Sequence, residues 1–166
     1  MRFVDFLKAT VLLSAGSATV LAVFTVLRVS TGDQESLMWV AVGWWLVAAL
    51  IGVWLGRRNA ASPPIARLLA DARMQMSLPE PRPAITLLNR LWPLLFSTVG
   101  AGVLGIFLPQ VSAVAAGFAI IWALAWRRQE AAVSAIEDRD GFRFYVDTTP
   151  PLAPIKLVRT PGLMAG

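Results

Sequence analysis

The sequence predicts an all-α integral membrane protein with four transmembrane helices as two antiparallel hairpins, plus a cytoplasmic interfacial helix and a short C-terminal β-hairpin. Of its 166 residues, 57% are hydrophobic and only 15% are charged, whereas about 25% are charged in ordinary soluble domains. Four long segments contain no Asp, Glu, Lys or Arg. We therefore expect a four-helix transmembrane domain, residues 1–136, followed by a cytoplasmic tail, residues 137–166.

The four apolar segments are long enough to be transmembrane helices. They cover residues 9–27, 37–55, 91–108 and 111–126. A helix of about 19 residues is about 28 Å long, which is close to the thickness of the hydrocarbon core of a bilayer. The fourth segment is shorter, and we expect Pro109 and Gln110 or residues after Trp126 to extend it. Buried helices of a soluble bundle would carry a polar stripe, whereas these segments are apolar all round.

The basic residues predict the topology. Fourteen of the 15 lie before the first segment, in the loop 56–90 or after Trp126, and only Arg28 lies in the first loop. Because cytoplasmic loops carry the excess of Lys and Arg, both termini and the loop 56–90 are expected in the cytoplasm. Thirteen of the basic residues are Arg, which favours a GC-rich genome. The predicted location is therefore the bacterial cytoplasmic (inner) membrane.

Tryptophan residues lie near the ends of the apolar segments, as an aromatic belt at the membrane interface requires. They are Trp39, Trp54, Trp92 and Trp126. Two of these ends are alike, because Trp54 and Trp126 are each followed within four residues by a pair of arginines. The likeness indicates either an internal duplication of one helical hairpin or the usual composition of a cytoplasmic helix end. We favour the second interpretation.

The loop 56–90 contains a predicted amphipathic helix. Ser62 suits the N-cap position and Pro63 the first turn, and Ile65 and Leu69 then share one face. We expect this helix to lie on the membrane surface with its arginines toward anionic lipid; the alternative is docking against a partner. The arginines assigned to lipid headgroups are Arg57, Arg58, Arg67, Arg73, Arg127 and Arg128.

The tail predicts a β-hairpin after a turn at Asp140 and Gly141. Residues 142–146 alternate between apolar and polar side chains, and residues 155–159 form a second strand-like run after a Pro-rich connection. An isolated hairpin is only marginally stable in water, so it should lie on the helix ends, on the loop 56–90 or on another protein. The predicted docking residues are Phe142, Phe144, Tyr145, Ile155, Leu157 and Arg159.

Small residues on the first and third segments predict close helix packing. They are Ser14, Gly16, Ser17, Ala18, Gly100, Gly102 and Gly105. Residues 100–105 also match the pattern GxGxxG. A dinucleotide site needs a strand before this pattern, whereas here the pattern lies inside an apolar helix. Packing is therefore the useful interpretation.

The composition excludes many reactions. The chain has no Cys and no His, which rules out thiol catalysis, disulfides, Cys-type zinc sites, Ser-His-Asp triads and His-ligated haem. Glu137, Asp138 and Asp140 could hold a divalent cation, but such a short motif favours a solvated turn. Trp44, Trp45 and Trp122 could line a pocket for a quinone, pigment or lipid, or pack between helices. We predict no catalytic residue, no cofactor and no metal.

The function that these observations favour is not catalytic. We expect an integral membrane subunit or assembly partner of a larger bacterial complex, which docks through its cytoplasmic loop and tail. Its expected partners are membrane lipids and other membrane-protein chains or copies of itself, and not nucleic acid, because the apolar fraction is too high. The alternative is a homo-oligomeric channel or carrier for a small neutral or anionic solute. An interfacial lipid enzyme is a third reading, disfavoured by the scarcity of acid–base residues.

Overall fold

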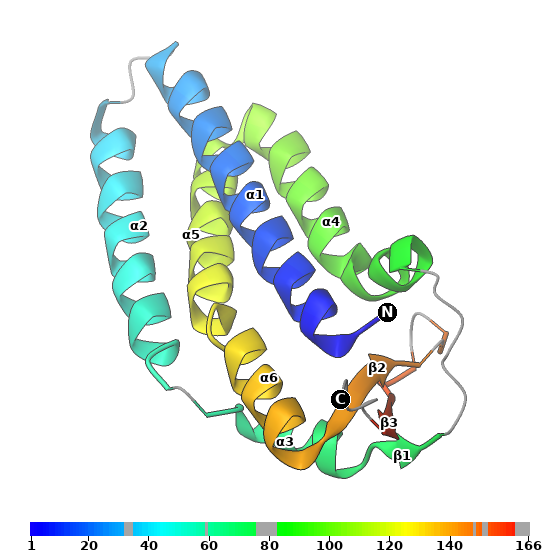
Figure 1. Cartoon of the computed structure of the whole chain (residues 1–166). Helices are drawn as coiled ribbons and strands as arrows, with labels where there is room; N and C mark the ends of the chain where they lie inside the picture. The colour runs from blue at the N-terminus through cyan, green and yellow to red at the C-terminus, as the bar shows by residue number, and fades with distance from the viewer. Residues whose placement is uncertain (32–34, 59, 76–82, 148, 151–152, 162–166) are drawn as a thin grey trace. The chain divides into compact units, whose positions relative to one another are not determined.

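The structure is a computed structural model that describes residues 1–31, 35–58, 60–75, 83–147, 149–150 and 153–161. These residues form six helices and three strands (Figure 1). They divide into two compact units. The mixed unit comprises residues 1–9, 58–91 and 128–166, and the helical unit comprises residues 10–57 and 92–127.

Four helices are long and apolar enough to span a membrane, as predicted. They are α1 (Phe3–Ser30), α2 (Glu35–Leu55), α4 (Pro83–Phe107) and α5 (Pro109–Trp126), and α5 is followed closely by α6 (Gln129–Asp140). Each helix contains most of a predicted apolar segment, and α1 and α4 begin several residues before theirs. Loss of hydrophobicity therefore does not mark a helix end. Pro109 occupies the first turn of α5, where its missing N–H costs nothing.

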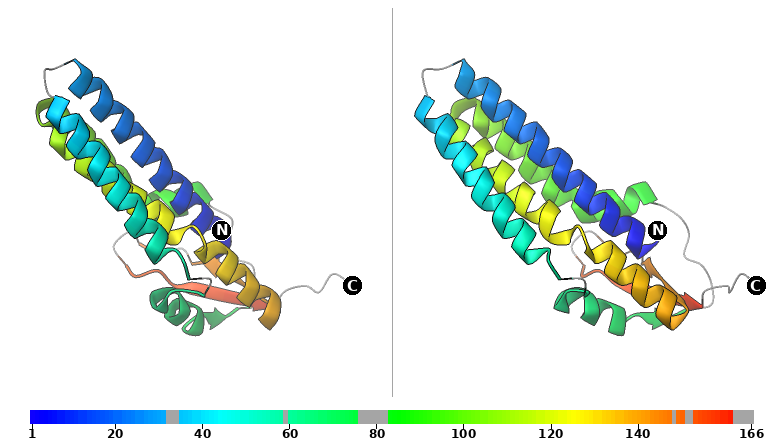
Figure 2. Two further views of the ribbon diagram at one scale, coloured as in Figure 1. Left: turned by 90° about the vertical axis from the view of Figure 1, so that its left-hand side faces the viewer. Right: turned by 60° about the vertical axis from the view of Figure 1, so that its left-hand side comes forward.

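In the helical unit, α2 packs along α5 in the same direction (Figure 2). The indole N–H of Trp45 donates to the carbonyl oxygen of Ala113 at 2.9 Å. Further along both helices, a Cβ at Gly52 would lie 2.8 Å from Cβ of Leu124. Since residue numbers rise together along the two helices, α2 and α5 run parallel.

Helix α1 contacts both α4 and α5 in this unit. Leu21, Ala101 and Ala116 are buried together. Thr25 Oγ1 lies 2.8 Å from Ser112 Oγ, and both side chains are fully buried. Here apolar contact and one hydroxyl pair hold three helices, which is the kind of packing that small residues permit in membrane proteins.

The mixed unit contains a three-stranded sheet of order β1-β3-β2. The predicted hairpin is confirmed, because β2 (Phe142–Val146) pairs antiparallel with β3 (Leu157–Pro161). The second strand begins two residues later than predicted, at Leu157. A strand that the sequence did not predict, β1 (Arg73–Met74), pairs parallel with β3. The first turns of α4 also belong to this unit, where Arg90 donates to Thr149 Oγ1 and to the carbonyl oxygen of Ala153.

Helix α3 (Pro63–Ala70) confirms the helix predicted in the loop 56–90 but not its setting on lipid. Ser62 is the N-cap residue, and its backbone N–H donates to Gln129 Oε1 at 2.8 Å. Ile65 and Leu69 are only 1% and 7% exposed. The apolar face is therefore covered by the chain itself and is not available to a membrane. Met76, predicted on the same face, lies outside the described residues.

Candidate functional site

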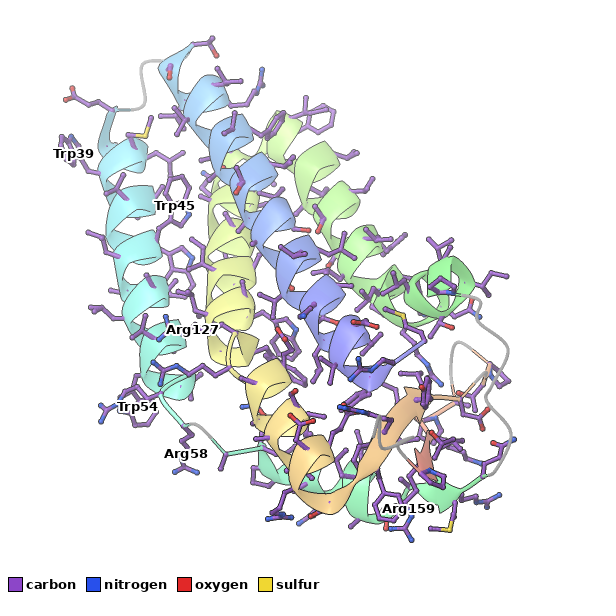
Figure 3. The ribbon with its side chains drawn as sticks, viewed as in Figure 1. Trp39, Trp45, Trp54, Arg58, Arg127 and Arg159 are labelled. Atoms are coloured by element: carbon purple, nitrogen blue, oxygen red, sulfur yellow. The ribbon has the colours of Figure 1, made fainter. Side chains whose placement is uncertain are left out.

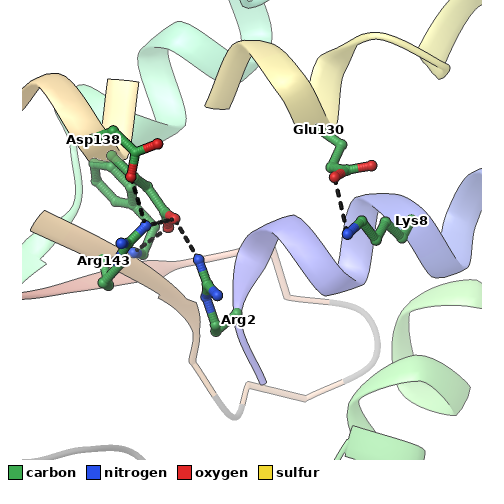
Figure 4. Close-up of polar contacts among 7 residues, drawn as sticks. Arg2, Lys8, Glu130, Asp138 and Arg143 are labelled. Atoms are coloured by element: carbon green, nitrogen blue, oxygen red, sulfur yellow. Dashed lines mark hydrogen bonds and ion pairs between the residues drawn. The ribbon is translucent and has the colours of Figure 1, made fainter. Parts of the chain in front are cut away.

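A buried carboxylate organises the mixed unit. Glu137, in the last turn of α6, is 1% exposed. Its Oε2 accepts from Arg2 Nη2 at 2.8 Å and from Arg143 Nη1 at 3.1 Å, and its Oε1 accepts from the backbone N–H of Phe144 at 2.9 Å (Figure 4). A buried charge needs such partners, because an unpaired carboxylate in the interior is very costly.

The turn after α6 brings these donors to Glu137. Gly141 has φ 69° and its N–H donates to the carbonyl oxygen of Glu137 at 3.0 Å. Glycine adopts this left-handed conformation without the penalty that a Cβ would bring. The chain then reverses into β2, so that Arg143 and Phe144 return to the carboxylate. The hydrogen bond to Glu137 raises the pKa of the Arg143 guanidinium, which therefore stays charged at every physiological pH.

The N-terminal residues belong to the same cluster. Arg2 pairs with Tyr145 on the edge of β2, and the N–H of Val146 donates to the carbonyl oxygen of Met1 at 3.0 Å. One α-helical turn and a half further on, Lys8 Nζ lies 3.0 Å from Glu130 Oε1 of α6 (Figure 4). Residues 1–9 are thus fixed to α6 by two ion pairs and to the sheet by backbone pairing.

The acidic residues around this turn are engaged by arginines. Asp138 Oδ1 lies 3.1 Å from Arg143 Nη1, and Asp140 Oδ1 lies 2.7 Å from Arg139 Nε. Among the described residues no group of three or more possible metal ligands occurs. With both oxygens of Glu137 occupied by donors and its side chain out of reach of solvent, the cluster can hold the fold together but offers no acid, base or ligand to a substrate.

The predicted docking residues fall into two groups. Phe144 and Leu157 are 5% and 3% exposed, so little of either side chain is left for a partner. Phe142, Tyr145 and Ile155 are partly exposed.

Arg159 is also partly exposed, and its guanidinium carbon lies 5.5 Å from the centre of the Phe142 ring. This distance is typical of a cation–π contact. The residues of the hairpin that remain accessible are therefore Phe142, Tyr145, Ile155 and Arg159, at its edges.

Of the predicted packing residues, Ser14, Ser17 and Ala18 are buried. A Cβ at Gly105 would lie 2.9 Å from Ser112 Cβ, so this glycine makes a close helix contact. A Cβ at Gly16, Gly100 or Gly102 would meet nothing within 4 Å. These three glycines therefore make no close helix contact in the chain, because the faces on which they lie are not those turned toward a neighbour.

Glycines that the sequence analysis had not assigned to packing are closer to a partner helix. The ring of Trp44 occupies the space above Gly117, where an added Cβ would lie 2.5 Å from Cε2 of the indole. The Trp44 N–H donates to the carbonyl oxygen of Val114 at 3.2 Å. Trp44 and Trp45 thus pack α2 against α5. The one local signal for this contact was a glycine within an Ala-rich stretch of α5.

The predicted headgroup arginines do not form one group. Arg67 and Arg73 belong to the mixed unit, on α3 and β1, and so do Arg58 and Arg128. Arg57 and Arg127 belong to the helical unit, where they follow the ends of α2 and α5, and both are exposed.

At the opposite end of the helical unit, Arg28 Nη2 donates to the carbonyl oxygen of Ile106 at 2.5 Å. This arginine therefore caps the C-terminal end of α4, where a cation is favourable.

Comparison with known proteins gives no relative: no protein-family model, no curated protein and no solved structure matches this chain.

Proposed function

We propose that this protein is a non-catalytic, multi-pass subunit of a membrane protein complex in the bacterial cytoplasmic membrane, with both termini in the cytoplasm. The mixed unit, held together by the buried Glu137, would present the accessible edge of the β2–β3 hairpin to a partner chain. The observation that carries the proposal is the distribution of polar groups. In the described part of the helical unit they bond within the chain, whereas the mixed unit keeps accessible polar and aromatic side chains.

The tryptophans of α2 support insertion in a bilayer. Trp39 and Trp54 are 69% and 66% exposed, near the two ends of this helix (Figure 3). The fifteen residues between them correspond to about 22 Å along the helix axis. Indole rings prefer the two interfaces of a bilayer whose hydrocarbon core is about 30 Å thick. Both rings can therefore reach interfacial depth while the exposed aliphatic side chains between them contact lipid.

The arginines support the orientation. Arg57 and Arg127 follow the ends of α2 and α5, whereas Arg28, at the other end of the helical unit, is used to cap α4. The one basic residue on the predicted outer side thus has a structural reason to be there. The positive-inside rule is then left with arginines on the predicted cytoplasmic side.

Buried hydroxyl groups of the helical unit find acceptors inside it. Ser112 Oγ donates to the carbonyl oxygen of Pro109 at 2.9 Å and Ser14 Oγ to that of Thr10 at 2.8 Å. The exposed Thr19 and Ser97 also bond to carbonyl oxygens of their own helices. These bonds leave few free hydrogen-bonding groups for the path of a polar solute, which disfavours the channel or carrier alternative.

Co-purification in mild detergent tests the proposal. We expect the full chain to retain a partner chain in fixed stoichiometry. Ile155→Glu should release the partner, because it places a charge at the accessible edge of the hairpin. Ala66→Glu, which adds the same charge on the exposed face of α3, should retain it. A protein that purifies alone would contradict the proposal, as would equal binding by both variants. A symmetric homo-oligomer with solute flux in liposomes would replace it with the channel.

A further inference from the structure

We propose that the adjoining ends of α2 and α5 form a binding site for the phosphate group of an anionic phospholipid. The inference rests on the membrane placement proposed above, and it assigns a lipid class to one end of the helical unit. The residues that carry it are Trp54, Gly56, Arg57, Trp126 and Arg127, all of which belong to this unit.

The backbones of the two helices touch at this end. A Cβ on Gly56 would overlap the carbonyl oxygen of Leu124, and a Cβ on Gly52 would lie 3.1 Å from Cα of Ile121. Only glycine permits such an approach without displacement of a neighbour. The chain leaves α2 at Gly56 and leaves α5 two residues after Leu124, so Arg57 and Arg127 start from adjoining positions.

The two arginines give this end a positive charge. In the described residues of the helical unit, the acidic side chain is Glu35, at the start of α2. It precedes Arg57 by twenty-two residues, or about 33 Å along a helix. No carboxylate of this unit therefore offsets the charge where α2 and α5 end. Each arginine is also followed in the sequence by a second one, Arg58 or Arg128.

The depth of the arginines suits a phospholipid phosphate. The Trp54 ring is exposed, and the rings of Trp122 and Trp126 stack at 5.6 Å. Indole rings mark the headgroup boundary, and Arg57 lies three residues, about 4.5 Å of helix rise, beyond Trp54. Guanidinium groups bind phosphate oxygens in a bidentate manner. Two of them favour a lipid with net negative charge over a zwitterionic one.

Thermal stabilisation of the purified full chain by added lipid tests this site. We expect phosphatidylglycerol to raise the unfolding temperature and phosphatidylcholine to do so much less. For R57Q/R127Q, the affinity for phosphatidylglycerol should fall about thirtyfold, since each basic residue near an anionic surface contributes about 1 kcal/mol. The matched control, R67Q/R73Q, removes the same charge from α3 and β1 and should bind as the wild type does.

Further arms separate the outcomes. R57K/R127K keeps both charges, so it should bind more tightly than R57Q/R127Q, and this ranking remains measurable if the glutamine variant is less stable. Equal loss in R57Q/R127Q and R67Q/R73Q would overturn the site, because net charge alone would then explain binding. Equal stabilisation by soluble glycerol phosphate would show an anion site without lipid. Extraction of the chain from membranes by alkaline buffer would instead refute the membrane placement itself.

Discussion

Removal of the Glu137 carboxylate is the sharpest test of how the mixed unit is held together. Glu137→Ala deletes three hydrogen bonds, to Arg2, Arg143 and the N–H of Phe144. Loss of one partner from a buried ion pair costs about 3–5 kcal/mol. The side chains of Arg2 and Arg143 are 40% and 39% exposed and can be rehydrated, so we take the lower end, about 3 kcal/mol. The Phe144 N–H, which is buried, cannot be compensated in this way.

The measurement is thermal unfolding in detergent, with limited proteolysis to report on the mixed unit alone. A loss of about 3 kcal/mol lowers the unfolding temperature by about 6–12 °C in a chain of this size. Asp138→Asn is the matched control, because Asp138 bonds the same Arg143 from a side chain that is 65% exposed, and such pairs contribute about 0–1 kcal/mol. Equal stability of the two variants would refute the reasoning, since burial would then not distinguish the two carboxylates.

Two further predictions concern the helical unit and the topology. Gly117→Ala should cost about 1–3 kcal/mol of stability by overpacking, because the new Cβ would meet the Trp44 ring; Gly16→Ala, with nothing within 4 Å of its Cβ, should be neutral, and equal unfolding temperatures would contradict the α2–α5 packing. In this Cys-free chain, single cysteines at Ser36 and Ser62 should be labelled from opposite sides of the membrane, Ser62 from the cytoplasm, and labelling of Ser62 from outside would reverse the orientation.

Local signals predicted the parts of the fold that depend on local sequence. An apolar run that must cross a bilayer is visible in composition alone, and the hairpin followed from alternation next to a turn. Strand β1 has only two residues, Arg73 and Met74, and pairs with a strand more than eighty residues later. The burial of Glu137 depends on Arg2, 135 residues earlier in the chain. Neither long-range pairing leaves a local signal in a single sequence.

Periodicity also predicts that a face is covered without predicting what covers it. The apolar face of α3 reads the same whether lipid or protein lies against Ile65 and Leu69. Small-residue spacing has the same ambiguity, because it does not specify the rotation of each helix toward its neighbours. Gly105 faces Ser112, whereas Gly100 and Gly102, on the same helix, face open space. Helix rotation is set by many contacts at once, here including the fit of Trp44 over Gly117.

The buried carboxylate also decides how docking must be tested. Deletion of residues 142–166 would be the simplest way to remove a docking tail. It would also remove Arg143 and the N–H of Phe144 from Glu137, and the edge of β2 that pairs with Arg2. Phe3 and Leu7, now 2% and 1% exposed, would lose the anchor that holds their segment. A partner released by this deletion would therefore report collapse of the mixed unit, and only point variants at the hairpin edge can report docking.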